Sequence, residues 1–102
     1  MELKDLIEGQ TFYGVLGKLV RDHDGNRKRV ISIPGQIIPA GIYIECSKSV
    51  REKNAIGTMF KINVGVSRKP VGTVYLHSLK KLELLTLDEW EQRYGGRSMR
   101  AS

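Results

Sequence analysis

The residue types that most often carry out catalysis or bind metal are few in this sequence and widely spaced. Histidine occurs only as His23 and His77, and the single cysteine is Cys46. Neither histidine has a second histidine or a cysteine at the spacing typical of tetrahedral metal ligands. A Cys46–His77 pair would need an accessible thiol and a third orienting group, whereas Cys46 falls on the inward side of a predicted strand. We therefore expect no catalytic residue, no metal and no cofactor, in a protein that is not an enzyme.

Basic side chains are the second group that could do chemistry, by binding polyanions. The chain of 102 residues has 17 Lys and Arg against 11 Asp and Glu, a net charge of +6 and a pI near 9.7. Residues 21 to 81 hold twelve basic and four acidic side chains, while residues 1 to 20 and 82 to 102 each sum to −1. Such an excess favours polyanionic partners, nucleic acid above all.

Three predicted connections carry most of these cations. If the strands form an up-and-down meander, residues 21 to 29, 47 to 54 and 78 to 81 fall at one end of the sheet. Contacts to phosphates there would supply affinity without reading sequence. The alternative is that hairpin tips are basic only because they face water. The nine cations of these tips are Arg21, Arg27, Lys28, Arg29, Lys48, Arg51, Lys53, Lys80 and Lys81.

A second candidate surface is the outward side of the two clearest predicted strands. Tyr75 could stack on unpaired bases there while Lys61 meets the nucleic-acid backbone. The alternative is that tyrosine stands on a strand for its β propensity and its cross-strand packing. The remaining residues of this face are Tyr43, Asn63, Thr73 and His77.

Alternating apolar residues predict the strands that must position these side chains. Residues 11–20 have β character, and Gly14 and Gly17 within them indicate a bulge, not a phosphate-binding loop, because neither glycine opens a helix. Asp24-Gly25 indicates a hairpin, and Ile33 to Gly41 forms a connection whose Ile37 and Ile38 are expected to pack under the core. Further strands are predicted at residues 30–33, 41–46, 58–66, 71–78 and 81–85, with Phe60, Ile62, Val64 and Val66 inward in the clearest of them.

Helices are predicted only at the two ends of the chain. Leu3, Leu6 and Ile7 share one face of a short N-terminal helix. Thr86 and Glu89 fit the capping-box pattern and open a second helix, on which Leu87, Trp90 and Tyr94 share a face. The two glycines at 95 and 96 end it, and residues 97 to 102 are expected to form a mobile basic tail.

These elements predict a mainly β protein. We expect a small five- or six-stranded antiparallel barrel or strongly curled sheet, SH3-like or OB-like, as one domain over residues 1 to 96. No apolar run is long enough to span a membrane, and Met1 to Asp5 lack the pattern of a secretion signal, so a soluble cytoplasmic protein is expected.

The sequence favours a non-enzymatic module that binds nucleic acid through phosphate contacts with little sequence specificity. The first alternative is a protein-interaction module that binds an acidic partner or a second copy through a sheet edge or the Ile37-Ile38 segment. The second is a small-ligand binder, although so short a chain leaves little room for a cavity. No motif carries a specific family resemblance.

Overall fold

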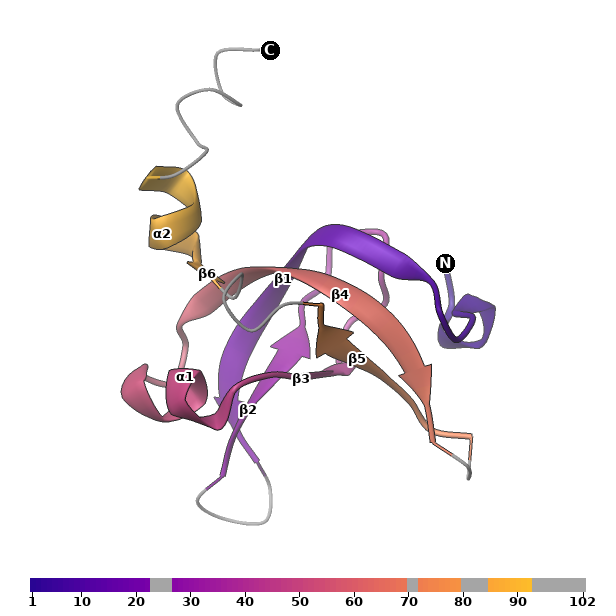
Figure 1. Cartoon of the computed structure of the whole chain (residues 1–102), viewed down its shortest axis with the longest axis horizontal. Helices are drawn as coiled ribbons and strands as arrows, with labels where there is room; N and C mark the ends of the chain where they lie inside the picture. The colour runs from indigo at the N-terminus through magenta and orange to yellow at the C-terminus, as the bar shows by residue number, and fades with distance from the viewer. Residues whose placement is uncertain (23–26, 70–71, 80–84, 93–102) are drawn as a thin grey trace.

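The computed structural model describes residues 1–22, 27–69, 72–79 and 85–92. Short strands dominate it, and a few helices of one or two turns lie at its margins (Figure 1). The elements are η1 Leu3–Asp5, β1 Thr11–Arg21, β2 Lys28–Ser32, β3 Tyr43–Glu45, α1 Lys48–Lys53, β4 Met59–Arg68, β5 Val74–Ser78, β6 Leu85–Thr86 and α2 Leu87–Trp90.

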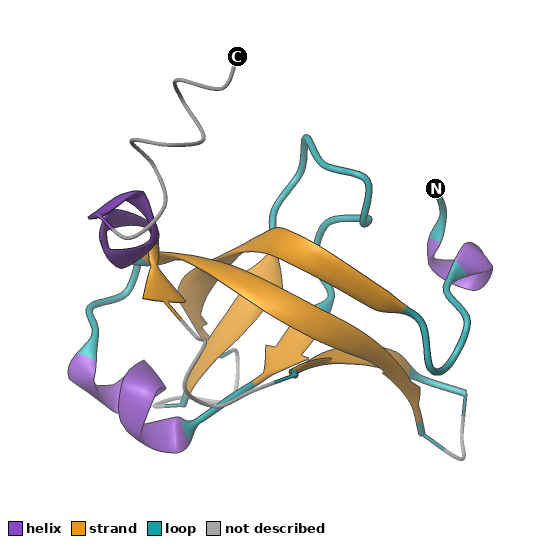
Figure 2. Cartoon of the chain, turned by 45° about the horizontal axis from the view of Figure 1, so that its top comes forward, coloured by secondary structure: helices purple, strands orange, loops and turns teal. Residues whose placement is uncertain are grey.

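Five strands close into a barrel, and β6 adds to its outside. Each strand pairs with the next in the order β1-β2-β3-β5-β4, and β4 pairs back with β1. Figure 2 shows the strands curled around one interior. The predicted fold class, a small mainly β barrel, is confirmed. The meander is wrong, because β3 pairs with β5 in parallel rather than with β4. Residues 46 to 58, which include α1, carry the chain from β3 to β4 on the far side of β5.

The barrel interior is filled by alternate residues of its strands, as period-two patterning requires. The prediction for β4 is confirmed, since Phe60, Ile62, Val64 and Val66 are all buried. Leucine, isoleucine and valine from the other strands complete one contiguous core. They are Val15 and Leu19 of β1, Val30 of β2, Ile44 of β3 and Leu76 of β5, joined by Leu6, Ile38 and Ile42.

β1 has a bulge at the first of its two glycines, Gly14, as the sequence predicted, whereas Gly17 pairs regularly with both neighbouring strands. The pairing of β1 with β4 shifts register between Phe12 and Val15, and Gly14 within this bulge has φ +68°. The Gly14 N–H donates to Asn63 Oδ1 at 2.9 Å, which fixes the bulge against β4. β1 pairs with β4 from Thr11 to Lys18 and with β2 from Gly17 to Arg21.

The connection from β2 to β3 is held by side chains rather than by strand pairing. Gln36 accepts a hydrogen bond from the Leu16 N–H at 2.9 Å and donates one to the Leu16 carbonyl at 2.8 Å. Of the two isoleucines expected under the core, Ile38 is buried but Ile37 is 71% exposed. The prediction for Ile37 was wrong, because its side chain lies in an open groove beside residues 11–15 rather than under the core.

The helices partly follow the predictions. The N-terminal turn is a 3₁₀ helix that ends at Asp5. Leu3, Leu6 and Ile7 therefore do not share a helical face, and of the three only Leu6 is buried. The Thr86–Glu89 capping box is confirmed by both of its hydrogen bonds. α1 was not predicted. The last predicted strand and helix are described only in part. The described residues place β6 at Leu85–Thr86 and α2 at Leu87–Trp90, and residues 81–84 and 93–102 lie outside the described residues.

Candidate nucleic-acid interface

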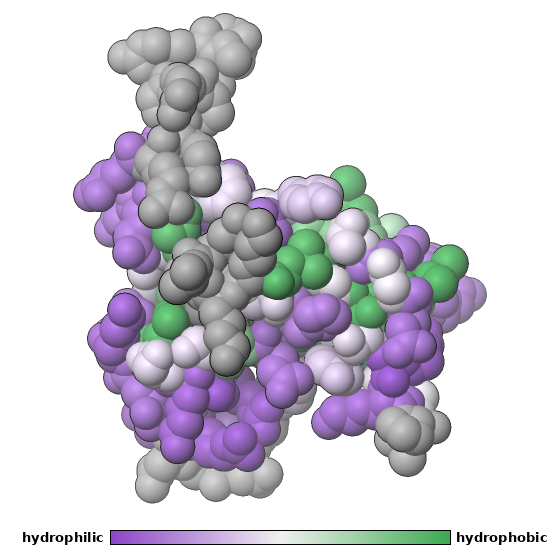
Figure 3. Space-filling view, viewed as in Figure 1, coloured by the Kyte–Doolittle hydropathy of each residue, from purple (hydrophilic) through white to green (hydrophobic). Residues whose placement is uncertain are grey.

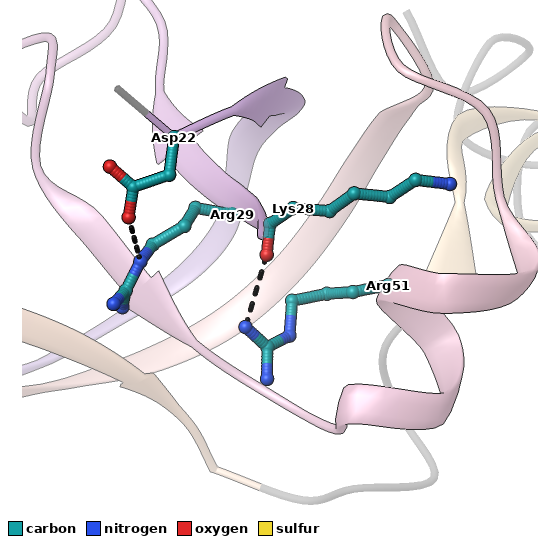
Figure 4. A network of polar contacts seen from close by, with 4 residues as sticks. All are labelled: Asp22, Lys28, Arg29 and Arg51. Carbon is teal, nitrogen blue, oxygen red and sulfur yellow. Dashed lines mark hydrogen bonds and ion pairs between the residues drawn. The ribbon is translucent and has the colours of Figure 1, made fainter. Parts of the chain in front are cut away.

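Basic side chains from two segments distant in sequence meet at the end of the barrel where β2 begins and α1 lies. The Lys28 ammonium donates to the Asn54 carbonyl at 2.6 Å, and the Arg51 Nη1 donates to the Lys28 carbonyl at 3.1 Å (Figure 4). These bonds tie α1 to the start of β2. Of the three predicted connections, residues 27–29 of the first therefore lie against residues 47–54 of the second; residues 23–26 of the first, and residues 80 and 81 of the third, lie outside the described residues.

An open groove lies between these two segments. Its volume is about 640 Å³, and hydrophilic side chains gather over α1 and the adjoining end of β2 (Figure 3). Counted over the described residues, four cations and one carboxylate line it. They are Arg27, Lys28, Lys48, Arg51 and Glu52, which we call the basic groove. Positive charges that converge on one concave surface raise the local concentration of anions.

A smaller hollow of about 150 Å³ continues from the basic groove across the outer face of β2, β3 and β5. Arg27 and Arg51 line both, so one strip of positive charge joins them. Glu45 supplies a carboxylate to the hollow. We call it the tyrosine hollow. Its full lining is Arg27, Arg29, Val30, Tyr43, Ile44, Glu45, Arg51, Lys69, Thr73 and Tyr75.

Each tyrosine of the hollow has a cation over its ring. The Arg29 guanidinium carbon lies 5.0 Å from the centre of the Tyr43 ring, and the Lys69 ammonium lies 5.5 Å from the centre of the Tyr75 ring. Both distances are within the range of cation–π attraction. Arg29 is also paired with Asp22 at 2.9 Å, which fixes the guanidinium on the outer face of β2 (Figure 4).

Arg51 lines both surfaces. Its Nη1 binds the Lys28 carbonyl, while its buried Nε has no hydrogen-bond partner among the described residues. A guanidinium has five N–H donors in a planar fork, the geometry that matches phosphate oxygens.

The structure brings six of the eleven predicted site residues to the two surfaces. Arg21 and Lys53 lie at the ends of β1 and α1 but line neither the groove nor the hollow. Lys80 and Lys81 lie outside the described residues. The six residues in place are Arg27, Lys28, Arg29, Lys48, Arg51 and Tyr75.

Lys61 and Tyr75 both lie on the outward side of their strands, as predicted, but they are too far apart to form one site. Tyr75 pairs with Ser67, six positions along β4 from Lys61, which is about 20 Å at the usual rise of a strand. Lys61 pairs instead with Leu16 and Leu85, and its ammonium lies 5.0 Å from the centre of the Trp90 ring. Because β4 is long and wraps around the barrel, its two halves face different directions.

Two other residues of that predicted face have structural partners. Asn63 accepts the Gly14 N–H in the bulge, and His77 Nδ1 shares a hydrogen bond of 2.8 Å with Ser67 Oγ. Lys69 of the tyrosine hollow was missed. Lys69 falls between the strands predicted at residues 58–66 and 71–78, in a connection that a meander would have placed at the opposite end of the sheet from the predicted site.

The described residues contain no cluster of three or more His, Cys, Asp or Glu side chains that could hold a metal ion. The helices in the described part of the chain are too short or too polar to cross a membrane. Cys46 packs against the core beside β3, half-buried. Burial raises the pKa of its thiol, Arg51 opposes this shift and Glu45 adds to it.

We expect the Cys46 thiol of the folded protein to react with iodoacetamide more slowly at neutral pH than the same thiol in urea. A raised pKa leaves a smaller fraction as the reactive thiolate, so the native rate should rise with pH to a midpoint above that of the unfolded chain. Because the pKa of this thiol is higher in the folded protein than in the unfolded chain, its protonated form contributes to the free energy of unfolding. This contribution is fully present below the pKa of the unfolded chain and is lost as pH rises through the pKa of the folded protein. Mass spectrometry of alkylated protein over a pH series measures this, and equal native and unfolded rates would contradict it.

Comparison with known protein families, curated proteins and solved structures found no match. The proposed function therefore depends on the barrel and on the chemistry of its two basic surfaces.

Proposed function

We propose that this protein is a non-enzymatic module that binds nucleic acid through its backbone phosphates, with little sequence readout. The observation that carries the proposal is the basic groove, where Arg27, Lys28, Lys48 and Arg51 converge from two segments. A polyanion laid in this groove would meet several cations at once. Each phosphate neutralised in this way releases condensed counterions, which favours binding whatever the base sequence.

The alternative, that these side chains are basic only because they face water, explains the groove less well. Lysines and arginines that serve only solubility are spread over a surface and keep edges apart. Here Lys28 and Arg51 use hydrogen bonds to hold two basic segments against each other, although this concentrates like charge. A bound anion would relieve the resulting repulsion.

The position of the two surfaces on the fold gives support by analogy. In five-stranded barrels of the OB kind, oligonucleotides bind across the second and third strands, between the loops that join strands 1 and 2 and strands 4 and 5. The tyrosine hollow spans β2 and β3, and Arg27 and Lys69 flank it from those same two connections. Fold analogy alone does not establish function, so the proposal depends on the residues.

Fluorescence anisotropy with labelled oligonucleotides at several salt concentrations tests the proposal. If the four groove cations each neutralise one phosphate, the logarithm of the affinity for duplex DNA should fall with the logarithm of salt at a slope of about −3 to −4. Absence of binding at low salt, or an affinity that salt does not change, would overturn the proposal.

A second candidate function is self-association, favoured by an uncharged groove on another face. The groove has a volume of about 550 Å³ and lies between residues 11–15 of β1 and residues 36–38 of the next loop. Within it Tyr13 is 75% exposed and Ile37 71% exposed. A second copy could cover these side chains without burying charge. Light scattering after size-exclusion chromatography should then show a dimer that Ile37→Asp converts to monomer; a wild-type monomer at all concentrations would exclude it.

A further inference from the structure

We propose that the preferred ligand is single-stranded nucleic acid, with its unpaired bases stacked on the rings of Tyr43 and Tyr75. This inference rests on the proposed phosphate-binding function and names the form of nucleic acid that the same surface selects. It is carried by the tyrosine hollow rather than by the basic groove.

The two rings stand at the same level on neighbouring strands. β3 and β5 pair in parallel with Ile44 opposite Leu76, so Tyr43 and Tyr75, one residue earlier in each strand, are neighbours on the outer face. Ile44 and Leu76 are buried, which turns both tyrosines outward. Tyr43 is 44% exposed and both rings line the hollow. The strands therefore present an aromatic surface two rings wide.

The cations over these rings suit a nucleotide better than an apolar ligand. Arg29 lies over one face of the Tyr43 ring and Lys69 over one face of the Tyr75 ring, so a base stacked on the opposite face of either ring would have a cation on the far side of that ring. An unpaired nucleotide carries a phosphate on each side of its base, within reach of such a side chain. Arg27 and Arg51, which line both surfaces, allow the same strand to continue into the basic groove.

A duplex cannot use this surface fully. Its bases are already stacked on one another, so their faces are closed to a protein ring, whereas a single strand can turn its bases outward. Cross-strand packing accounts for tyrosine on adjacent strands. It does not require that both rings line a hollow with a cation over each.

The first test compares the affinity of the wild-type protein for two single strands of equal length and charge. One is an oligothymidine of about ten nucleotides, and the other is its abasic counterpart. Stacking predicts that the oligothymidine binds roughly tenfold tighter or more, because each base–aromatic stack contributes substantially to affinity. Equal affinity for the two, with the salt dependence retained, would overturn this inference and leave the proposed function standing. Binding of neither at low salt would overturn both.

The second test locates the rings. Tyr43→Leu and Tyr75→Leu should each weaken oligothymidine binding by roughly tenfold while leaving the abasic strand unaffected. Tyr13→Leu is the matched control, because Tyr13 is exposed on the other groove. If the Tyr13 variant loses as much affinity as the other two, or if Tyr43→Leu and Tyr75→Leu lose none, the assigned site is wrong. Circular dichroism checks that each variant is folded. The comparison of oligothymidine with the abasic strand uses only the wild-type protein, so it does not depend on the folding of the variants.

Discussion

Replacing Phe60 by alanine is expected to lower the free energy of unfolding by about 3–5 kcal/mol. The side chain is 0% exposed near the start of β4, where it pairs across to Gly17 of β1 and Thr86 of β6. Its removal leaves a cavity between strands that are closed into a barrel and cannot collapse freely. Since small domains are stable by only about 5–15 kcal/mol, urea unfolding followed by circular dichroism should show a large loss of stability.

Tyr13→Ala is the control for this prediction. It removes a ring of similar size that is 75% exposed, so the free energy of unfolding should change by less than about 1 kcal/mol. Equal losses for the two variants would contradict the placement of Phe60 at the centre of the core.

Reversing the charge at two positions of the basic groove is expected to weaken nucleic-acid binding by about 100-fold at low salt. The double variant Arg27→Glu and Lys48→Glu removes two phosphate contacts and adds two repulsive charges. The salt dependence should become shallower by about two contacts. Both side chains are exposed, so the fold should be retained. Anisotropy titrations at several salt concentrations measure both effects.

A second double variant separates the groove from net charge. Lys4→Glu and Lys18→Glu change the net charge by the same amount, from +6 to +2, at exposed positions that line neither the basic groove nor the tyrosine hollow. We expect its affinity to fall only a few-fold. If the two double variants weaken binding equally, long-range charge rather than the groove is responsible.

Local patterns in the sequence predicted most strands and much of the core. The alternation through β4 identified its buried face, and Gly14 marked the bulge of β1, because side-chain period and glycine conformation are set by neighbouring residues. The Thr86–Glu89 capping box was predicted for the same reason.

The sequence did not predict the strand order, because a strand's partners are chosen by contacts distant in sequence. β3 pairs with β5, so Tyr43 lies beside Tyr75, and Lys69 joins the candidate site while Lys61 leaves it. α1 was missed because it buries no residue and so has no apolar stripe to identify it. Nucleic-acid binding itself stays a prediction.

The pairing of β1 with β4 also determines how the chain must assemble. It joins Thr11 to Gly65 and Lys18 to Met59, so the barrel closes only when segments about 40 to 55 residues apart meet. The entropy of closing that loop is lost before the buried contacts repay it, which places folding in the slower range typical of small β domains, milliseconds to seconds. β1 and β2, adjacent in sequence, can pair early, whereas β4 must arrive before the core excludes water.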